Sequence, residues 1–169
     1  TGFHIFNNTL YGSEAGDRGV DGVVMMLSSS GHVIENNTIY NHAREDGIDL
    51  KGVRKTTKTS AAETIVRGNT IYGHRVQSGI TCQMGTRNVR IYNNIVSGNV
   101  YALWVREYAT NGVYENTQNI FVYNNIFTHN LQSGIKSSDY FDRGLFIWNN
   151  VIAFNGGTGN GNNSAYTGM

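Results

Sequence analysis

An asparagine pair recurs along this chain inside segments that otherwise have the composition of β-strands. The stretch "VRIYNNIVSGN" (89–99) is one copy, and others are "FHIFNNTLYGS", "HVIENNTIYNH", "IFVYNNIFTHN" and "LFIWNNVIAFN", with "TIVRGNTIYGH" as a glycine-asparagine variant. Asparagine is normally disfavoured within strands. Six such copies therefore indicate a structural element that the chain repeats.

The copies align on their second asparagine and follow one another at intervals of 25 to 32 residues: Asn8, Asn37, Asn69, Asn94, Asn125 and Asn150. Repeats of this length are typical of a solenoid or an array. The position three before is always apolar (Ile5, Ile34, Val66, Ile91, Val122, Ile147), as is the position two after (Leu10, Ile39, Ile71, Val96, Phe127, Ile152). This predicts two short strands with inward side chains, joined by a polar corner.

If each repeat is one coil, successive asparagines stack at about the 4.8 Å spacing of neighbouring strands. Their side-chain amides can then hydrogen-bond to one another and satisfy buried polar groups. The asparagines are thus predicted to form a ladder.

A third strand per repeat is predicted from short apolar segments that open with glycine or alanine, at 22–26, 47–51, 79–83, 102–106 and 134–138. Three strands per coil, all running the same way, predict an all-β right-handed parallel β-helix of about six coils. A β-propeller would need blades of about 40 residues with four strands. An ice-binding β-helix would need a uniform outward threonine column, which the sequence lacks.

Composition fits one domain of 169 residues, with coils over 3–155 and a Gly/Asn-rich tail over 156–169. Hydrophobic residues make up 39% and charged residues 15%, which is ordinary for a globular chain. The formal net charge of +1 gives no general attraction to nucleic acid, and no apolar run reaches membrane-spanning length. We therefore expect neither nucleic acid nor a membrane as a partner.

Both ends of a parallel β-helix expose unpaired strand edges, which must be covered. The first residues here already belong to a repeat. We expect either a piece of a longer β-helix or molecules that associate with one another, end to end or laterally.

On these features the sequence resembles the right-handed parallel β-helix proteins of the pectate-lyase-like superfamily over residues 3–155. The resemblance implies a secreted or cell-surface protein that acts on carbohydrate. One fold hosts many functions, so the activity has to be argued from a site.

The outer side of the third strands is the predicted site. Extra residues at 52–63 and 107–118 are expected to wall a groove there, because insertions in repeat proteins gather on the binding face. Two outward columns are predicted: Val24, Asp49, Thr81, Trp104 and Lys136, and Met26, Lys51, Gln83, Arg106 and Ser138.

These residue types suit β-elimination on a uronate-containing, acidic polysaccharide, with Lys51 as base and Arg106 neutralising the developing charge. We expect Arg54 and Lys55 nearby, or a bound cation, to lower the pKa of Lys51. Glu45, Asp46 and Asp49 offer the oxygen ligands that Ca²⁺ needs. The predicted substrate-binding residues are Asp49, Gln83, Trp104, Tyr101, Lys136, Arg54 and Lys55.

The segment "REDGIDLKG" (44–52) is similar to a segment of alginate lyases and chondroitinase B, in which an acidic calcium ligand precedes the catalytic lysine. The similarity places Asp46 on the ligand position and Lys51 on the lysine. It implies a polysaccharide lyase, or a related uronan epimerase. Gln83 stands where that family has an arginine, and Arg106 lies one coil further.

Other interpretations stay open. Asp46 and Asp49 are also expected as turn caps on a solvated face, and Lys51 as a surface lysine. The runner-up function is a noncatalytic β-helix module that binds glycans or builds a surface fibre or adhesin.

Two further columns are predicted. His42 and His74 align with Asn99, Asn130 and Asn155 as a second polar corner ladder. Tyr92, Tyr123 and Trp148 form an outward column beside Phe121 and Phe146, for stacking on sugar rings or for packing under another subunit or a missing segment.

Overall fold

The computed structural model describes residues 2–12, 20–26, 29–42, 44–53, 62–107, 109–110, 113–114, 116–138, 144–156 and 165–166. No helix occurs in these ranges, and so none that is long and apolar enough to cross a membrane.

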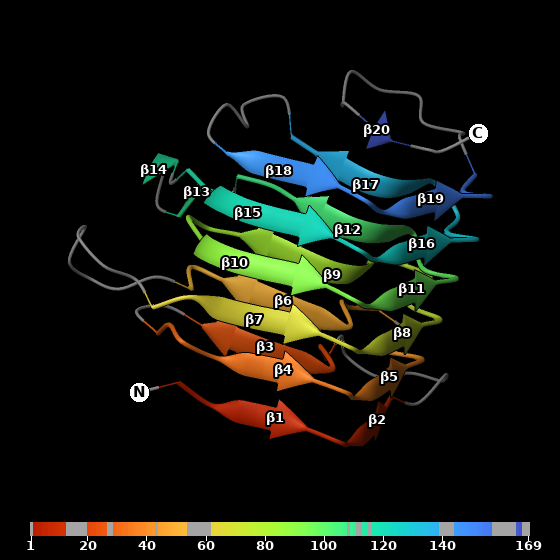
Figure 1. Cartoon of the computed structure of the whole chain (residues 1–169), viewed down its shortest axis with the longest axis horizontal. Helices are drawn as coiled ribbons and strands as arrows, with labels where there is room; N and C mark the ends of the chain where they lie inside the picture. Colours follow the sequence, from red (N-terminus) through yellow and green to blue (C-terminus); the bar gives the residue numbers. More distant parts are fainter. Residues whose placement is uncertain are drawn as a thin grey trace.

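The strands stack into three sheets that wind around one core as a parallel β-helix (Figure 1). The first sheet contains β1 (His4–Phe6), β4 (Val33–Glu35), β7 (Thr64–Arg67), β10 (Arg87–Tyr92), β15 (Gln118–Tyr123) and β18 (Leu145–Trp148). The second contains β2 (Thr9–Tyr11), β5 (Thr38–Tyr40), β8 (Thr70–Tyr72), β11 (Ile95–Ser97), β16 (Ile126–Thr128) and β19 (Val151–Ala153). The third contains β3 (Val23–Met26), β6 (Ile48–Lys51), β9 (Ser78–Gln83), β12 (Tyr101–Val105), β17 (Ser133–Ser137) and β20 (Ala165–Tyr166).

The predicted fold is confirmed, and the five predicted third strands are each correct to within one residue. The expected count of about six coils differs slightly. Strand β20 pairs antiparallel with β17, so among the described residues only five coils have three parallel strands. A small antiparallel pair, β13 (Ala109–Thr110) and β14 (Val113–Tyr114), lies in the second predicted insertion.

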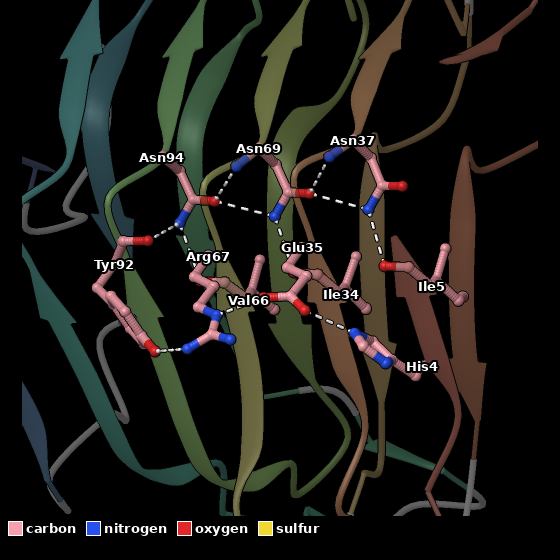
Figure 2. Close-up of polar contacts among 10 residues, drawn as sticks. All are labelled: His4, Ile5, Ile34, Glu35, Asn37, Val66, Arg67, Asn69, Tyr92 and Asn94. Carbon is pink, nitrogen blue, oxygen red and sulfur yellow. Dashed lines mark hydrogen bonds and ion pairs between the residues drawn. The ribbon is translucent and has the colours of Figure 1, made fainter. Parts of the chain in front are cut away.

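The asparagine ladder forms as predicted at the corner between the first and second sheets (Figure 2). The backbone N–H and Nδ2 of Asn69 both donate to Oδ1 of Asn94, each at 3.0 Å. Nδ2 of Asn69 also donates to the carbonyl of Ile34, in the preceding coil, at 2.9 Å. The buried side chain of Asn69 therefore joins three coils.

The first residue of each corner has the opposite role. Asn36, Asn93 and Asn124 are exposed and have φ between 55 and 56°, and the equivalent Gly68 has φ of 64°. Asparagine and glycine tolerate this left-handed conformation better than other residues. The corner thus needs one residue for the turn and one for the ladder, which explains the pair.

The core consists of the predicted inward columns. The middle coils bury these side chains completely, as in Val66, Ile91, Ile71 and Val96. At the two ends the equivalent residues are only partly buried: Ile5, Leu10, Ile147 and Ile152. Cys82 is a buried core residue of β9 and carries the molecule's only thiol.

The second predicted ladder is also present. The backbone N–H of His74 donates to Oδ1 of Asn99 at 3.0 Å, and Nδ2 of Asn99 donates to Oδ1 of Asn130 at 3.2 Å. The imidazoles of His42 and His74 stack with ring centroids 5.4 Å apart. Histidine and asparagine therefore occupy one continuous ladder at the corner between the second and third sheets.

Candidate functional site

The outer side of β3, β6, β9, β12 and β17, called here the third-sheet face, carries the two predicted columns in the predicted register. Asp49 pairs with Thr81, and Thr81 with Trp104, while Lys51 pairs with Gln83. Arg106 directly follows β12, and its backbone N–H donates to the carbonyl of Cys82. Arg54 and Lys55, predicted to line this face, lie outside the described residues, as does most of the first insertion.

Asp49 and Gln83 point outward but are almost fully buried, with exposed fractions of 1% and 2%. The side-chain amide of Gln83 satisfies this carboxylate: its Nε2 donates to both Asp49 oxygens at 2.8 Å. Nζ of Lys51 lies 2.8 Å from Oδ2 of Asp49. These residues thus form the interior of a polar network.

Asp46 is part of a short carboxylate ladder at the start of the third strands. Oδ1 of Asp21 accepts from the backbone N–H of Asp46 at 3.1 Å, and Oδ1 of Asp46 accepts from that of Ser78 at 2.8 Å. In the ladders of the other corners the direction is reversed, because each backbone N–H donates to a side chain of the following coil. Asp46 therefore has a structural role in joining coils, but it is buried and does not lie on the solvated face that the turn-capping interpretation expected.

Three carboxylates meet at this place. One carboxylate oxygen from each of Asp21, Asp46 and Asp49 lies within 4.8 Å of the other two. Asp21 was missing from the predicted ligands, although it occupies the same column as Asp46 in the sequence. Glu45, which was included, does not belong to this group.

Burial is the main cause of raised pKa values among the acidic residues here. Burial, reinforced by the charge of Asp49, raises the pKa of Asp46 to about 7. Burial also raises the pKa of Asp49, although the hydrogen bonds from Lys51 and Gln83 oppose the rise. Burial and the charge of Asp21 raise the pKa of Glu45. Ionisation of these buried carboxylates is therefore unfavourable unless a nearby cation stabilises their negative charge.

Lys51 is that cation. Its Nζ lies 3.2 Å from Oδ2 of Asp21 as well as 2.8 Å from Asp49. Burial acts to lower the pKa of Lys51, but the two carboxylates outweigh it and the pKa is raised. The prediction of a lowered pKa was wrong, because it considered the neighbouring basic residues and not these carboxylates.

The donor set is of the type that Ca²⁺ prefers, since carboxylate oxygens are hard ligands. The ammonium group of Lys51, however, is already within hydrogen-bond distance of two of the three carboxylates. A calcium ion between Asp21 and Asp49 would have to displace it. The chain's own lysine therefore supplies the counter-charge.

A second group of residues, called here the cation cluster, lies on β12, β17 and the residue after β12: Tyr101, Trp104, Arg106 and Lys136. The guanidinium of Arg106 lies 4.1 Å from the centre of the Trp104 ring. Nζ of Lys136 lies 4.4 Å from the Tyr101 ring centre and 4.6 Å from that of Trp104. All four residues are partly exposed.

Hydrogen bonds fix the cluster. Nζ of Lys136 donates to the hydroxyl of Tyr101 at 3.0 Å, which donates to Oε1 of Gln132 at 2.6 Å. Nε of Arg106 donates to Oε1 of Gln83 at 2.9 Å, which links this cluster to the carboxylates. Gln132 was not predicted, and the spacing of the repeats gives no signal for it.

A family model described as a right handed beta helix region matches residues 1–167. No curated protein and no solved structure matches the chain.

Proposed function

We propose that this chain, which belongs to the right-handed β-helix family, binds an acidic polysaccharide along the third-sheet face. The cation cluster is the main contact. The observation that carries the proposal is the pair of partly exposed cations, Arg106 and Lys136, held on the rings of Trp104 and Tyr101. Strands β12 and β17 carry no acidic side chain. A carboxylate or sulfate of a glycan can therefore approach both cations.

The fixed positions of the side chains in the cation cluster support the proposal of glycan binding. Side chains on neighbouring strands recur at about 4.8 Å, so the cluster offers a fixed row of contacts to an extended polymer. Cations already ordered by rings lose less conformational entropy on binding than free side chains.

We expect Lys136→Ala to weaken binding of alginate, pectate or chondroitin sulfate by about fivefold, since a partly exposed cation contributes roughly 1 kcal/mol. Arg75→Ala removes the same charge from an exposed turn before β9 and is the matched control. Titration calorimetry at two salt concentrations measures both. Equal losses in the two variants, or no binding by the unaltered chain, would refute the proposal.

β-Elimination is the second candidate, favoured by one observation. Lys51 and Arg106 lie in one column and are connected through Asp49 and Gln83. A base must be uncharged, whereas the carboxylates keep Lys51 protonated. The noncatalytic function is therefore the better supported of the two.

If the lyase reaction occurs, its rate should rise toward alkaline pH, as Lys51 loses its proton. Lys51→Arg should abolish the ultraviolet-absorbing unsaturated product while it preserves the ion pairs and glycan binding, because arginine does not deprotonate. The assay is run with and without calcium. Product formation that survives Lys51→Arg would exclude Lys51 as the base.

A further inference from the structure

The outer side of the first sheet, called here the first-sheet face, changes in character along the molecule. Its two outward columns, from the N-terminal to the C-terminal coil, are His4, Val33, Ile65, Arg90, Phe121 and Phe146, and Phe6, Glu35, Arg67, Tyr92, Tyr123 and Trp148. The charged residues lie in the first four coils, whereas all four outward residues of the last two coils are aromatic. Phe146 and Trp148 are 47% and 41% exposed.

The charged residues form one chain of contacts across the strands (Figure 2). His4 and Arg67 both contact the carboxylate of Glu35 at 2.6 Å. The guanidinium of Arg67 also donates to the hydroxyl of Tyr92 at 2.9 Å. Arg90 pairs with Glu63. Two arginines thus face two glutamates, and the face has little net charge to attract a polyanion.

The rings are stacked face to face. Tyr92 and Tyr123 lie 5.0 Å apart with planes within 4°, and Tyr123 and Trp148 lie 4.6 Å apart within 11°. Stacked rings present their edges to solvent, whereas a sugar packs on a ring's flat side. Of the two uses predicted for these aromatics, packing against protein therefore fits the geometry better.

The second column is complementary to a copy of itself that runs in the opposite direction. If a second copy is placed with its coils in the reverse order, the opposing pairs become Phe6 with Trp148, Glu35 with Tyr123 and Arg67 with Tyr92. The first pair is aromatic with aromatic. In the second a hydroxyl can donate to a carboxylate, and in the third a guanidinium can donate to a hydroxyl oxygen, which accepts two hydrogen bonds.

The first column agrees with the same arrangement. Its opposing pairs are His4 with Phe146, Val33 with Phe121 and Ile65 with Arg90. Each contains at least one apolar side chain and none brings like charges together. Two sheets packed face to face lie about 10 Å apart with interdigitating side chains, which these columns can fill.

We propose that two copies of this chain form a two-fold dimer through the first-sheet face, with the axis along the strand direction between β7 and β10. Such an interface is isologous, so every pair occurs twice. The third sheet lies on the opposite side of the molecule from the first (Figure 1). The dimer therefore leaves both third-sheet faces outward, which gives a polymeric ligand two sites to bind.

A double variant, Glu35→Cys with Tyr123→Cys, tests the pairing directly. Within one chain these positions lie three strand spacings apart, about 14 Å, which is too far for a disulfide. In the dimer the cysteine introduced at position 35 faces the cysteine introduced at position 123 of the partner subunit, and the reverse pair also forms. Mild oxidation should yield a covalent dimer from the double variant and none from either single variant.

The oligomeric state of the unaltered chain is measured by sedimentation. We expect a dimer that Tyr123→Glu dissociates, because this glutamate faces Glu35 of the partner subunit. Ile126→Glu, which alters an exposed apolar residue of the second sheet, should leave the dimer intact, and circular dichroism confirms that both variants fold. A monomer at all concentrations, or an open-ended series of masses from end-to-end stacking, would overturn the proposal. Glycan binding by a monomer would leave the proposed function untouched.

Discussion

Asn94→Ala is expected to lower the free energy of unfolding by on the order of 3 kcal/mol. The side chain of Asn94 donates to the carbonyls of Val66 and Tyr92 and to Oδ1 of Asn125, and its own Oδ1 accepts two hydrogen bonds from Asn69. Alanine removes all of these contacts at a position only 1% exposed. The backbone N–H of Asn69 and the carbonyl of Val66 then lose these partners while they remain buried.

The preceding residue provides the control. Asn93 is exposed and serves the turn, and the equivalent position of another coil is Gly68. Asn93→Gly should therefore change the free energy of unfolding by less than about 0.5 kcal/mol. Urea denaturation of both variants measures the difference. If Asn94→Ala costs no more than Asn93→Gly, the ladder contributes little to stability.

The fold was predictable because a solenoid converts sequence periodicity into contacts. In most folds a residue's neighbours depend on packing between distant segments. Here Ile34, Val66 and Ile91 are neighbours because they occupy the same place in successive repeats. The strand register, the inward columns and both ladders follow from that one alignment.

The site was less predictable, because periodicity gives the direction of a side chain but not what covers it or which groups it contacts. Asp49 and Gln83 do point outward, yet they are buried. The ion pair between Lys51 and Asp21 joins residues of different coils through long, flexible side chains. Asp49 and, to a lesser extent, this contact with Asp21 raise the pKa of Lys51, and the repeat pattern does not encode the contact.

Stability at acid pH should depend on two buried groups, His74 and Asp46, whose pKa values are shifted in opposite directions. Burial, with the nearby charge of His42, lowers the pKa of His74 from 6.5 to about 4. Below pH 6.5 the unfolded chain binds a proton at this position that the folded chain does not, so His74 destabilises the fold as the pH falls toward 4. The difference in pKa corresponds to on the order of 3 kcal/mol.

Asp46 acts in the other direction. Its folded-state pKa of about 7 lies above the ordinary 3.8, so between these values the folded chain binds the additional proton. Stability due to Asp46 therefore increases as the pH falls through 7, by on the order of 4 kcal/mol. In the unaltered chain the two contributions largely cancel between pH 7 and 4.

Single substitutions should separate the two contributions. Asp46→Asn keeps an oxygen that accepts from the N–H of Ser78 but removes the titrating group, so its free energy of unfolding should fall steeply between pH 6.5 and 4. His74→Asn places in the ladder the residue type found at Asn99 and Asn130, and its free energy of unfolding should rise over the same range. Urea denaturation at several pH values gives both slopes, and comparing the variants with each other cancels the background titration of the other groups. The two slopes differ in sign only if both residues keep their shifted pKa values in the folded protein; equal slopes would show that neither group is buried as this fold requires.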